Sequence, residues 1–124
     1  MILVDTSVWI DHLRHTEPEL ARNLNAGNVL MHSMVIGEVA CGNLPNRTGT
    51  LQRLNGLPGI DELDNDEVLL LIQERELMGR GIGLVDVHLV GSVLNHIDAV
   101  LWTRDKRLGR VAEDLEIAYP EKRP

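Results

Sequence analysis

The sequence contains few aromatic residues and almost no cysteine. Phe is absent, and two Trp and one Tyr are the only aromatic side chains, so we expect a core of Leu, Val and Ile. The single cysteine, Cys41, excludes an internal disulfide bond, and a cytosolic setting fits this composition best. No apolar run approaches the length of a membrane span, and no basic-then-apolar leader precedes Ile2, so we expect no membrane attachment.

The chain also lacks an excess of positive charge. Its formal net charge of -7 at pH 7 argues against a general nucleic-acid binder, which is normally basic. An enzyme that meets phosphate groups through bound cations stays open, because a metal ion inverts the local electrostatics. The 124 residues, 44% of them hydrophobic, predict one domain over residues 1–124, with a polar tail over about 120–124 that frays.

Strand and helix patterns alternate along the chain. This alternation predicts a three-layer α/β/α fold, in which a mostly parallel central sheet carries helices on both faces. We expect strands over residues 1–5, 28–32, 59–63, 99–103 and 116–119. We expect three capped helices: one capped by Thr6 or Ser7, one by Ser33, and one by Asn65 that runs towards Gly79. We expect further helices that begin near Pro18 and Asp86, and others around residues 51–54 and 108–115. The expected inner faces include Trp9, Ile10 and Leu13 in the first helix and an apolar stripe over residues 89–97.

Two carboxylates follow strands of this predicted sheet. Asp5 ends the apolar run from Ile2 to Val4, and Asp105 lies just beyond the strand at 99–103. Ligands of open parallel sheets bind outside the carboxyl ends of the strands. Asp5 and Asp105 therefore stand where a three-layer α/β domain places its active site.

Two further acids occur in apolar helices. Glu38 is the only charged side chain between Met34 and Cys41, and this helix is apolar nearly all round, so we expect Glu38 within a core-facing surface. Asp86 begins the apolar stripe of a later helix. A role for Asp86 as a simple helix cap is the alternative, and the pattern leaves both open.

Convergence of these four carboxylates would require cations. Two unit charges about 5 Å apart repel by roughly 3 kcal/mol at an effective dielectric constant near 20. Hard divalent ions with oxygen ligands relieve such repulsion, so we expect Mg²⁺, with Mn²⁺ as a plausible substitute. Asp5 and Asp105 are the expected direct ligands, and Asp86 either binds directly or orients a coordinated water. Glu38 is expected in the outer shell or as the group that activates water, in phosphate-transfer chemistry that needs no Ser, Cys or His nucleophile.

Four segments of the chain resemble a known family. "ILVDTSVWID", "IGEVACG", "GLVDVHLVGSVL" and "LWTRDKRLGRVAEDL" are similar, in this order, to segments of PIN domains, and most closely to VapC-type toxin ribonucleases of bacterial toxin–antitoxin pairs. The "VDTSVWID" and "TRDKRL" segments are the most specific. Two residues depart from the family pattern. His88 stands where the family usually has an aliphatic or small residue, and Gly91 stands where it usually has Ala.

This resemblance implies a cytoplasmic, metal-dependent endoribonuclease that cleaves single-stranded RNA and acts as the toxin of a toxin–antitoxin module. It implies a catalytic quartet of acids, a homodimer, and a tight complex with a cognate antitoxin. It also implies that hydroxyl groups hold carboxylates or metal-bound waters. The residues that match the quartet are Asp5, Glu38, Asp86 and Asp105. The residues that match these hydroxyls are Thr103, Thr6 and Ser7.

Other polar residues allow more than one interpretation. Arg104, Lys106, Arg107 and Arg110 cluster beside Asp105. They could contact RNA phosphates, or could form a solvated helix face. We expect His12, His88 and His96 to be surface or core residues and not ligands, and Cys41 to be a small buried residue. Apolar helices near residues 7–25 and 50–57 could expose a groove for an antitoxin helix, or could be ordinary core.

Several other functions compete with the toxin hypothesis. A PIN-type nuclease of RNA processing would use the same chemistry, and a non-catalytic binding module could keep the fold. A phospho-receiver domain needs a phosphate-accepting Asp after a middle strand, and residues 45–60 offer no such strand. A haloacid-dehalogenase-type phosphatase is disfavoured because no second Asp lies two residues after Asp5.

Overall fold

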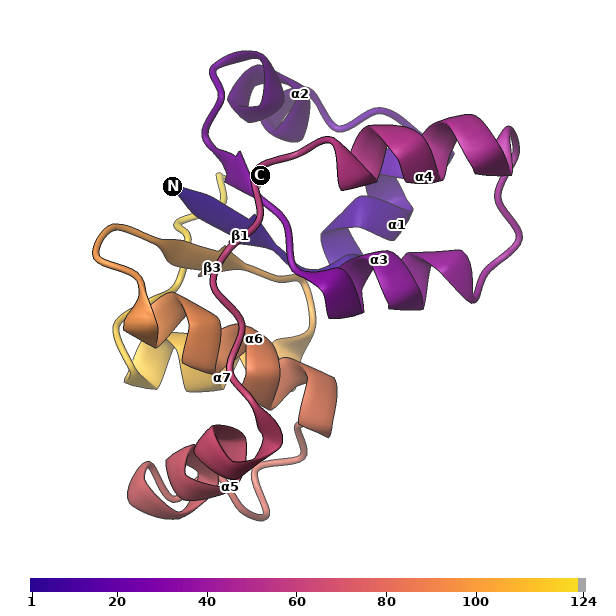
Figure 1. Cartoon of the computed structure of the whole chain (residues 1–124). Coiled ribbons are helices and arrows are strands. Elements are labelled where there is room, and N and C mark those ends of the chain that lie inside the picture. Colours follow the sequence, from indigo (N-terminus) through magenta and orange to yellow (C-terminus); the bar gives the residue numbers. More distant parts are fainter. Residues whose placement is uncertain (123–124) are drawn as a thin grey trace.

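A three-stranded parallel sheet lies between two groups of helices in a computed structural model that describes residues 1–122 (Figure 1). Strand β1, Ile2–Val4, is central, with β2, Val29–Leu30, on one side and β3, Val100–Trp102, on the other. Leu3 pairs with Leu30 and with Leu101, so three Leu residues form one row across the sheet. The strands are short apolar runs, as expected for strands that helices cover on both faces.

The helices form the two outer layers. One group comprises α1, Thr6–Arg14, α2, Pro18–Asn25, α3, Ser33–Ala40, and α4, Arg47–Asn55. The other comprises α5, Asn65–Glu74, α6, Leu84–Asn95, and α7, Lys106–Asp114. Figure 1 shows these groups on opposite sides of the sheet, which confirms the predicted three-layer α/β/α fold. No helix within residues 1–122 is both long and apolar enough to cross a membrane.

Several predicted boundaries were wrong by one or more residues. The strands expected over 59–63 and 116–119 are reduced to single parallel bridges, Met31 with Gly59 and Leu101 with Ala118. Helix α5 ends at Glu74 and does not continue to Gly79, and α6 begins at Leu84, before Asp86. Residues 123 and 124, the last two of the tail expected to fray, lie outside the described residues.

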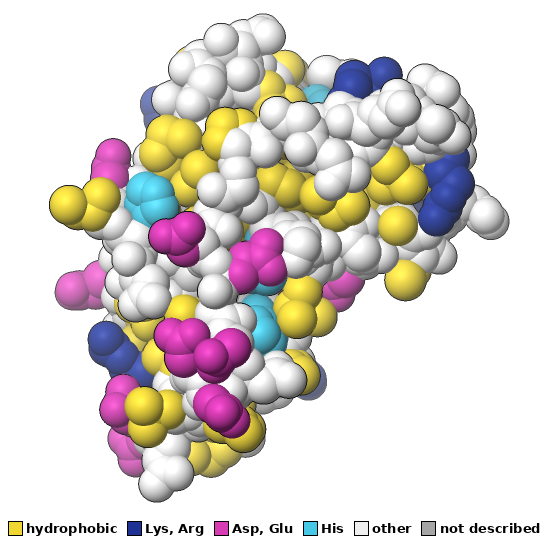
Figure 2. Space-filling model, in the orientation of Figure 1, with side chains coloured by type: hydrophobic (Ala, Val, Ile, Leu, Met, Phe, Trp, Pro, Cys, Tyr) yellow, Lys and Arg dark blue, Asp and Glu magenta, His cyan; other side chains and the backbone are white. Residues whose placement is uncertain are grey.

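Three helices are capped one residue earlier than the sequence suggested. Asp5 caps α1 and accepts from the Ser7 N–H, in place of Thr6 or Ser7. His32 caps α3 in place of Ser33, and Asp64 caps α5 in place of Asn65. In each case the true cap has an acceptor atom that reaches an unpaired N–H of the first turn. Asp64 and Glu67 form a reciprocal capping box, so part of the acidic stretch over residues 61–67, which Figure 2 shows around α5, has a structural role.

The core is aliphatic, as predicted, and both Trp9 and Trp102 lie inside it. Some residues expected inside are outside. Ile10 is 38% exposed, and Ile97 is fully exposed because α6 has already ended at Asn95. Cys41 is also exposed, because it follows the end of α3. For Ile10 the cause is different, since an apolar pattern leaves open which face of a short helix meets the sheet.

Two histidines are buried between the layers. His32 is fully buried and His88 is 3% exposed, with ring centroids 6.2 Å apart. The His32 Nδ1 atom accepts from the Met34 N–H at 3.0 Å, so His32 must be neutral at that nitrogen to cap α3. Burial lowers the pKa of His32. The nearby Glu62 carboxylate raises this pKa, and His88 lowers it further.

This environment predicts a loss of stability in mild acid. Because the folded-state pKa lies below the unfolded value of 6.5, the unfolded chain binds more protons once the pH falls below about 6.5. Stability should then fall by at most about 1.4 kcal/mol per pH unit for this one site. We expect wild-type protein to lose more stability than His32→Asn between pH 7.5 and pH 5.5, because Asn can cap the helix without titrating. Urea unfolding at both pH values measures the difference, and equal losses would contradict the prediction.

Candidate active site

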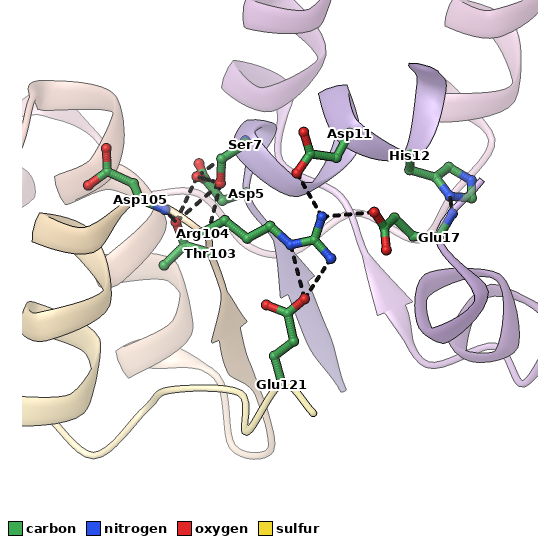
Figure 3. Close-up of polar contacts among 9 residues, drawn as sticks. All are labelled: Asp5, Ser7, Asp11, His12, Glu17, Thr103, Arg104, Asp105 and Glu121. Atoms are coloured by element: carbon green, nitrogen blue, oxygen red, sulfur yellow. Dashed lines mark hydrogen bonds and ion pairs between the residues drawn. The ribbon is translucent and has the colours of Figure 1, made fainter. Parts of the chain in front are cut away.

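Asp5 lies at the carboxyl end of β1 and is 5% exposed. Its Oδ2 atom accepts from the Ser7 hydroxyl at 2.7 Å and from the Thr103 hydroxyl at 2.9 Å, with a longer contact of 3.4 Å from the Ser7 N–H (Figure 3). Its Oδ1 atom has no hydrogen bond with any described residue. The two hydroxyls therefore fix the orientation of a buried carboxylate and leave one of its oxygens available.

Asp105 is connected to Asp5 through Thr103. The Asp105 N–H donates to the Thr103 hydroxyl oxygen at 3.1 Å, while that hydroxyl donates to Asp5. The Asp105 Oδ1 atom caps α7 by accepting from the Leu108 N–H at 2.9 Å. The hydroxyl of Thr103 thus joins the ends of two neighbouring strands, because β1 and β3 are adjacent in the sheet.

Glu38 approaches from α3. Its Oε1 atom accepts from the Thr6 hydroxyl at 2.6 Å, so the residue that follows Asp5 orients a second acid. The prediction that Glu38 lies in a core-facing surface was wrong, because the side chain is exposed. Val35 and Val39 are the buried residues of α3, and Glu38 lies on a different face.

Asp86 combines the two roles that the sequence left open. It is the third residue of α6, and its Oδ2 atom accepts from the Gly83 N–H at 3.1 Å, which closes the start of the helix. Burial raises the pKa of Asp86 above its ordinary value, although the Gly83 hydrogen bond opposes this. The remaining rise in pKa comes from the negative charges of Asp5, Asp105 and Glu38, so Asp86 lies within electrostatic reach of the other three acids.

We refer to Asp5, Glu38, Asp86 and Asp105 as the acidic site. Each of these carboxylates has one oxygen held by a donor of the protein, and the other has no hydrogen bond with any described residue. Within residues 1–122, no three His, Cys, Asp or Glu side chains already have the spacing of a metal site. Four oxygen donors, oriented by local hydrogen bonds and repelling one another, suit a hard divalent cation, whose charge would draw them together.

The basic residues near Asp105 have unequal surroundings. Lys106 and Arg107 are exposed at the start of α7, and the Arg107 side chain lies against Gly81, in the loop before Asp86.

The RNA contact considered for Arg104 does not agree with its position. The Arg104 side chain is 10% exposed, and carboxylates surround it. Hydrogen bonds raise the pKa of Arg104, first from Glu17 and then from Glu121.

These carboxylate partners of Arg104 were missed by the sequence analysis. Arg104 binds Asp11, Glu17 and Glu121, which come from α1, the residue before α2 and the tail (Figure 3). The first two lie 93 and 87 residues away along the chain, so local spacing carries no signal of the contact. Glu121 lies in the tail that was expected to fray.

The parallel sheet, the covering helices and the acidic residues at strand ends define an α/β domain of nuclease type. The sequence matches the PIN domain over residues 2–114, and the chain therefore belongs to the PIN-domain family. It is 43% identical over 122 residues to proteins named Ribonuclease VapC32 from Mycobacterium tuberculosis, strains CDC 1551 / Oshkosh and ATCC 25618 / H37Rv. The match covers 98% of this chain and 98% of each relative. The family resemblance of the four motifs is thereby confirmed.

Proposed function

We propose that this protein is a metal-dependent endoribonuclease that cleaves single-stranded RNA. The observation that carries the proposal is the acidic site, in which four carboxylates from four separate segments each keep one oxygen available. Membership of the PIN-domain family and similarity to proteins named as ribonucleases support the same chemistry. The all-oxygen donor set suits Mg²⁺, or Mn²⁺ in its place.

Three of the acids act as metal ligands in this proposal. The oxygen available to the metal is Oδ1 in Asp5 and Asp86 and Oδ2 in Asp105, since protein donors bind the other oxygen of each. A bound divalent cation polarises the scissile phosphate and makes water a stronger nucleophile at neutral pH. The ionised form of Asp86 would gain from a bound cation, because burial and three like charges oppose its charge.

Glu38 is assigned a different role from the other acids. It is exposed and held only through Oε1 by Thr6, so its Oε2 atom is accessible to solvent and substrate. A carboxylate in this position can accept a proton from the attacking water as a general base. Thr6, Ser7 and Thr103 support the acids by donating hydrogen bonds, and Lys106 and Arg107 are the candidates for contacting RNA phosphates.

We also propose that the protein is the toxin of a toxin–antitoxin module, acting in the cytoplasm as a homodimer. The similarity to proteins named VapC32 supports this role and implies a cognate antitoxin. An apolar groove between α1 and α4, with a cavity of about 300 Å³, offers the antitoxin a docking place. Its lining includes Trp9, Leu13 and Leu54, with Arg53 as a charged neighbour, so an amphipathic helix with acidic flanks would fit.

Removal of metal tests the chemistry directly. Chelation by EDTA should reduce cleavage of a single-stranded RNA by at least about 100-fold, because the four acids cannot stabilise phosphate charge by themselves. Excess Mg²⁺ or Mn²⁺ should restore it, and a duplex of the same sequence should resist cleavage. Gel analysis of end-labelled RNA measures the products. Cleavage that continues unchanged in EDTA would refute the proposed mechanism.

A further inference from the structure

Arg104 links three segments of the chain at a point next to the acidic site. Its Nη1 atom lies 2.7 Å from Asp11 Oδ2 and 3.0 Å from Glu17 Oε1. Its Nη2 and Nε atoms lie 2.6 and 3.0 Å from Glu121 Oε1. Figure 3 shows the guanidinium among these carboxylates, while the Arg104 backbone lies beside Asp5, Ser7 and Thr103.

The charges around Arg104 decide what this side chain can bind. Three carboxylates already bind the guanidinium at 2.6 to 3.0 Å. A phosphate of RNA would have to displace these partners. The side chain is also 10% exposed, which leaves little surface for a ligand. Arg104 therefore serves the protein and not the substrate.

The backbone of Arg104 connects this cluster to the acids. The Arg104 N–H donates to the Ser7 hydroxyl oxygen at 3.0 Å, and that hydroxyl donates to Asp5. The neighbours of Arg104 on each side are Thr103, which also donates to Asp5, and Asp105. A displacement of residue 104 would thus change both hydroxyl bonds to Asp5 and the position of Asp105 at once.

We propose that Arg104 is a positioning residue, whose ion pairs with Asp11, Glu17 and Glu121 hold the segment from Thr103 to Asp105 in register with α1 and so fix Asp5 and Asp105 for metal binding. This inference rests on the proposed function of the acidic site. It adds the C-terminal tail to the active-site architecture, because Glu121 supplies two of the four contacts of the guanidinium.

The test compares Arg104→Ala with Arg104→Lys in the full chain. Because a displacement of about 1 Å in an active site can cost about 100-fold in rate, we expect Arg104→Ala to lower kcat by about 10- to 100-fold. The KM for RNA should change by less than about twofold, since no substrate contact is lost. Mn²⁺ affinity, measured by calorimetry without RNA, should fall in parallel with kcat. Arg104→Lys should recover part of both losses, because Lys keeps the charge without the planar fork.

Control variants separate the alternatives. Arg75→Ala removes an exposed positive charge at the end of α5 and should leave kcat and Mn²⁺ affinity unchanged. If Arg104→Ala does not fold, Glu121→Gln weakens the same cluster and should lower Mn²⁺ affinity in a folded protein. A folded variant with wild-type kcat and Mn²⁺ affinity would overturn the proposal, as would a raised KM with unchanged Mn²⁺ affinity. Calorimetry still decides the positioning role if the wild-type protein proves not to cleave RNA.

Discussion

Asp5→Asn is expected to abolish metal-dependent RNA cleavage without unfolding the protein. The substitution removes the charge of a buried carboxylate that we propose as a direct ligand. Loss of residues that merely support metal ligands typically costs 10- to 100-fold, so loss of a ligand charge should cost at least about 100-fold in cleavage. Cleavage of single-stranded RNA under saturating Mg²⁺, together with the Mn²⁺ affinity measured by calorimetry, tests this expectation.

The fold should survive this substitution because Asn can replace Asp5 in its local bonds. Asn is an equally good helix cap, and its carbonyl oxygen can accept from the Ser7 and Thr103 hydroxyls that now bind Oδ2. Asp61→Asn, at an exposed position in the segment before α5, is the matched control and should cleave normally. Full cleavage by a folded Asp5→Asn protein would refute the assignment of Asp5.

Asp86→Asn is expected to inactivate the enzyme and at the same time to stabilise its metal-free form. The raised pKa of Asp86 means that its ionised form is disfavoured by folding, so this charge reduces stability at pH values above its folded-state pKa. Asn removes the charge and can still accept from the Gly83 N–H. We expect the melting temperature without metal to rise by roughly 2 to 4 °C and cleavage to fall by at least about 100-fold.

Added metal should reverse the order of stability. A ligand present at about 100 times its dissociation constant stabilises a protein by roughly 2.7 kcal/mol, so saturating Mn²⁺ should raise the melting temperature of the wild type above that of Asp86→Asn. Asp66→Asn is the matched control, because Asp66 occupies the first turn of α5 as Asp86 does in α6. Asp66→Asn should destabilise slightly through the helix dipole. A lower melting temperature for metal-free Asp86→Asn would contradict the repulsion that we infer within the acidic site.

The stability gain and the activity loss have the same origin. Asp86 is repelled by the charges of Asp5, Asp105 and Glu38. In the proposed site, a bound cation would turn this cost into a favourable interaction. The hydroxyl of Thr103 reduces this cost for Asp5, and the N–H groups of Gly83 and Leu108 do so for Asp86 and Asp105. We therefore propose that the acidic site lowers the stability of the free protein and in return allows a metal ion to bind.

Much of the fold follows from local patterns. Short apolar runs such as Ile2 to Val4, alternating with helix patterns, predict the parallel sheet and its two helix layers without knowledge of distant contacts. The four motifs likewise predict the family, which the match over residues 2–114 confirms. Cap positions were less predictable, because Ser7, Ser33 and Asn65 are as suitable by type as the caps that the structure uses.

The faces of short helices could not be predicted from the sequence. Glu38 was expected towards the core and lies outside, and Ile10 is exposed against expectation. Ile97 and Cys41 are exposed for another reason, because α6 and α3 end before them. In a helix that is apolar on all sides, periodicity does not choose a face. Packing of the whole domain makes that choice, since only some faces can contact the sheet and the neighbouring helices.

The sequence alone determined the kinds of residue available for chemistry: four acids in family-specific motifs, with hydroxyls beside them. Only the tertiary structure decided how each carboxylate is oriented, and that Arg104 pairs with Asp11, Glu17 and Glu121 where an RNA contact had been considered. The physical reason is that residue type and spacing fix local conformation, whereas the energy of a charge depends on partners that folding brings from distant parts of the chain.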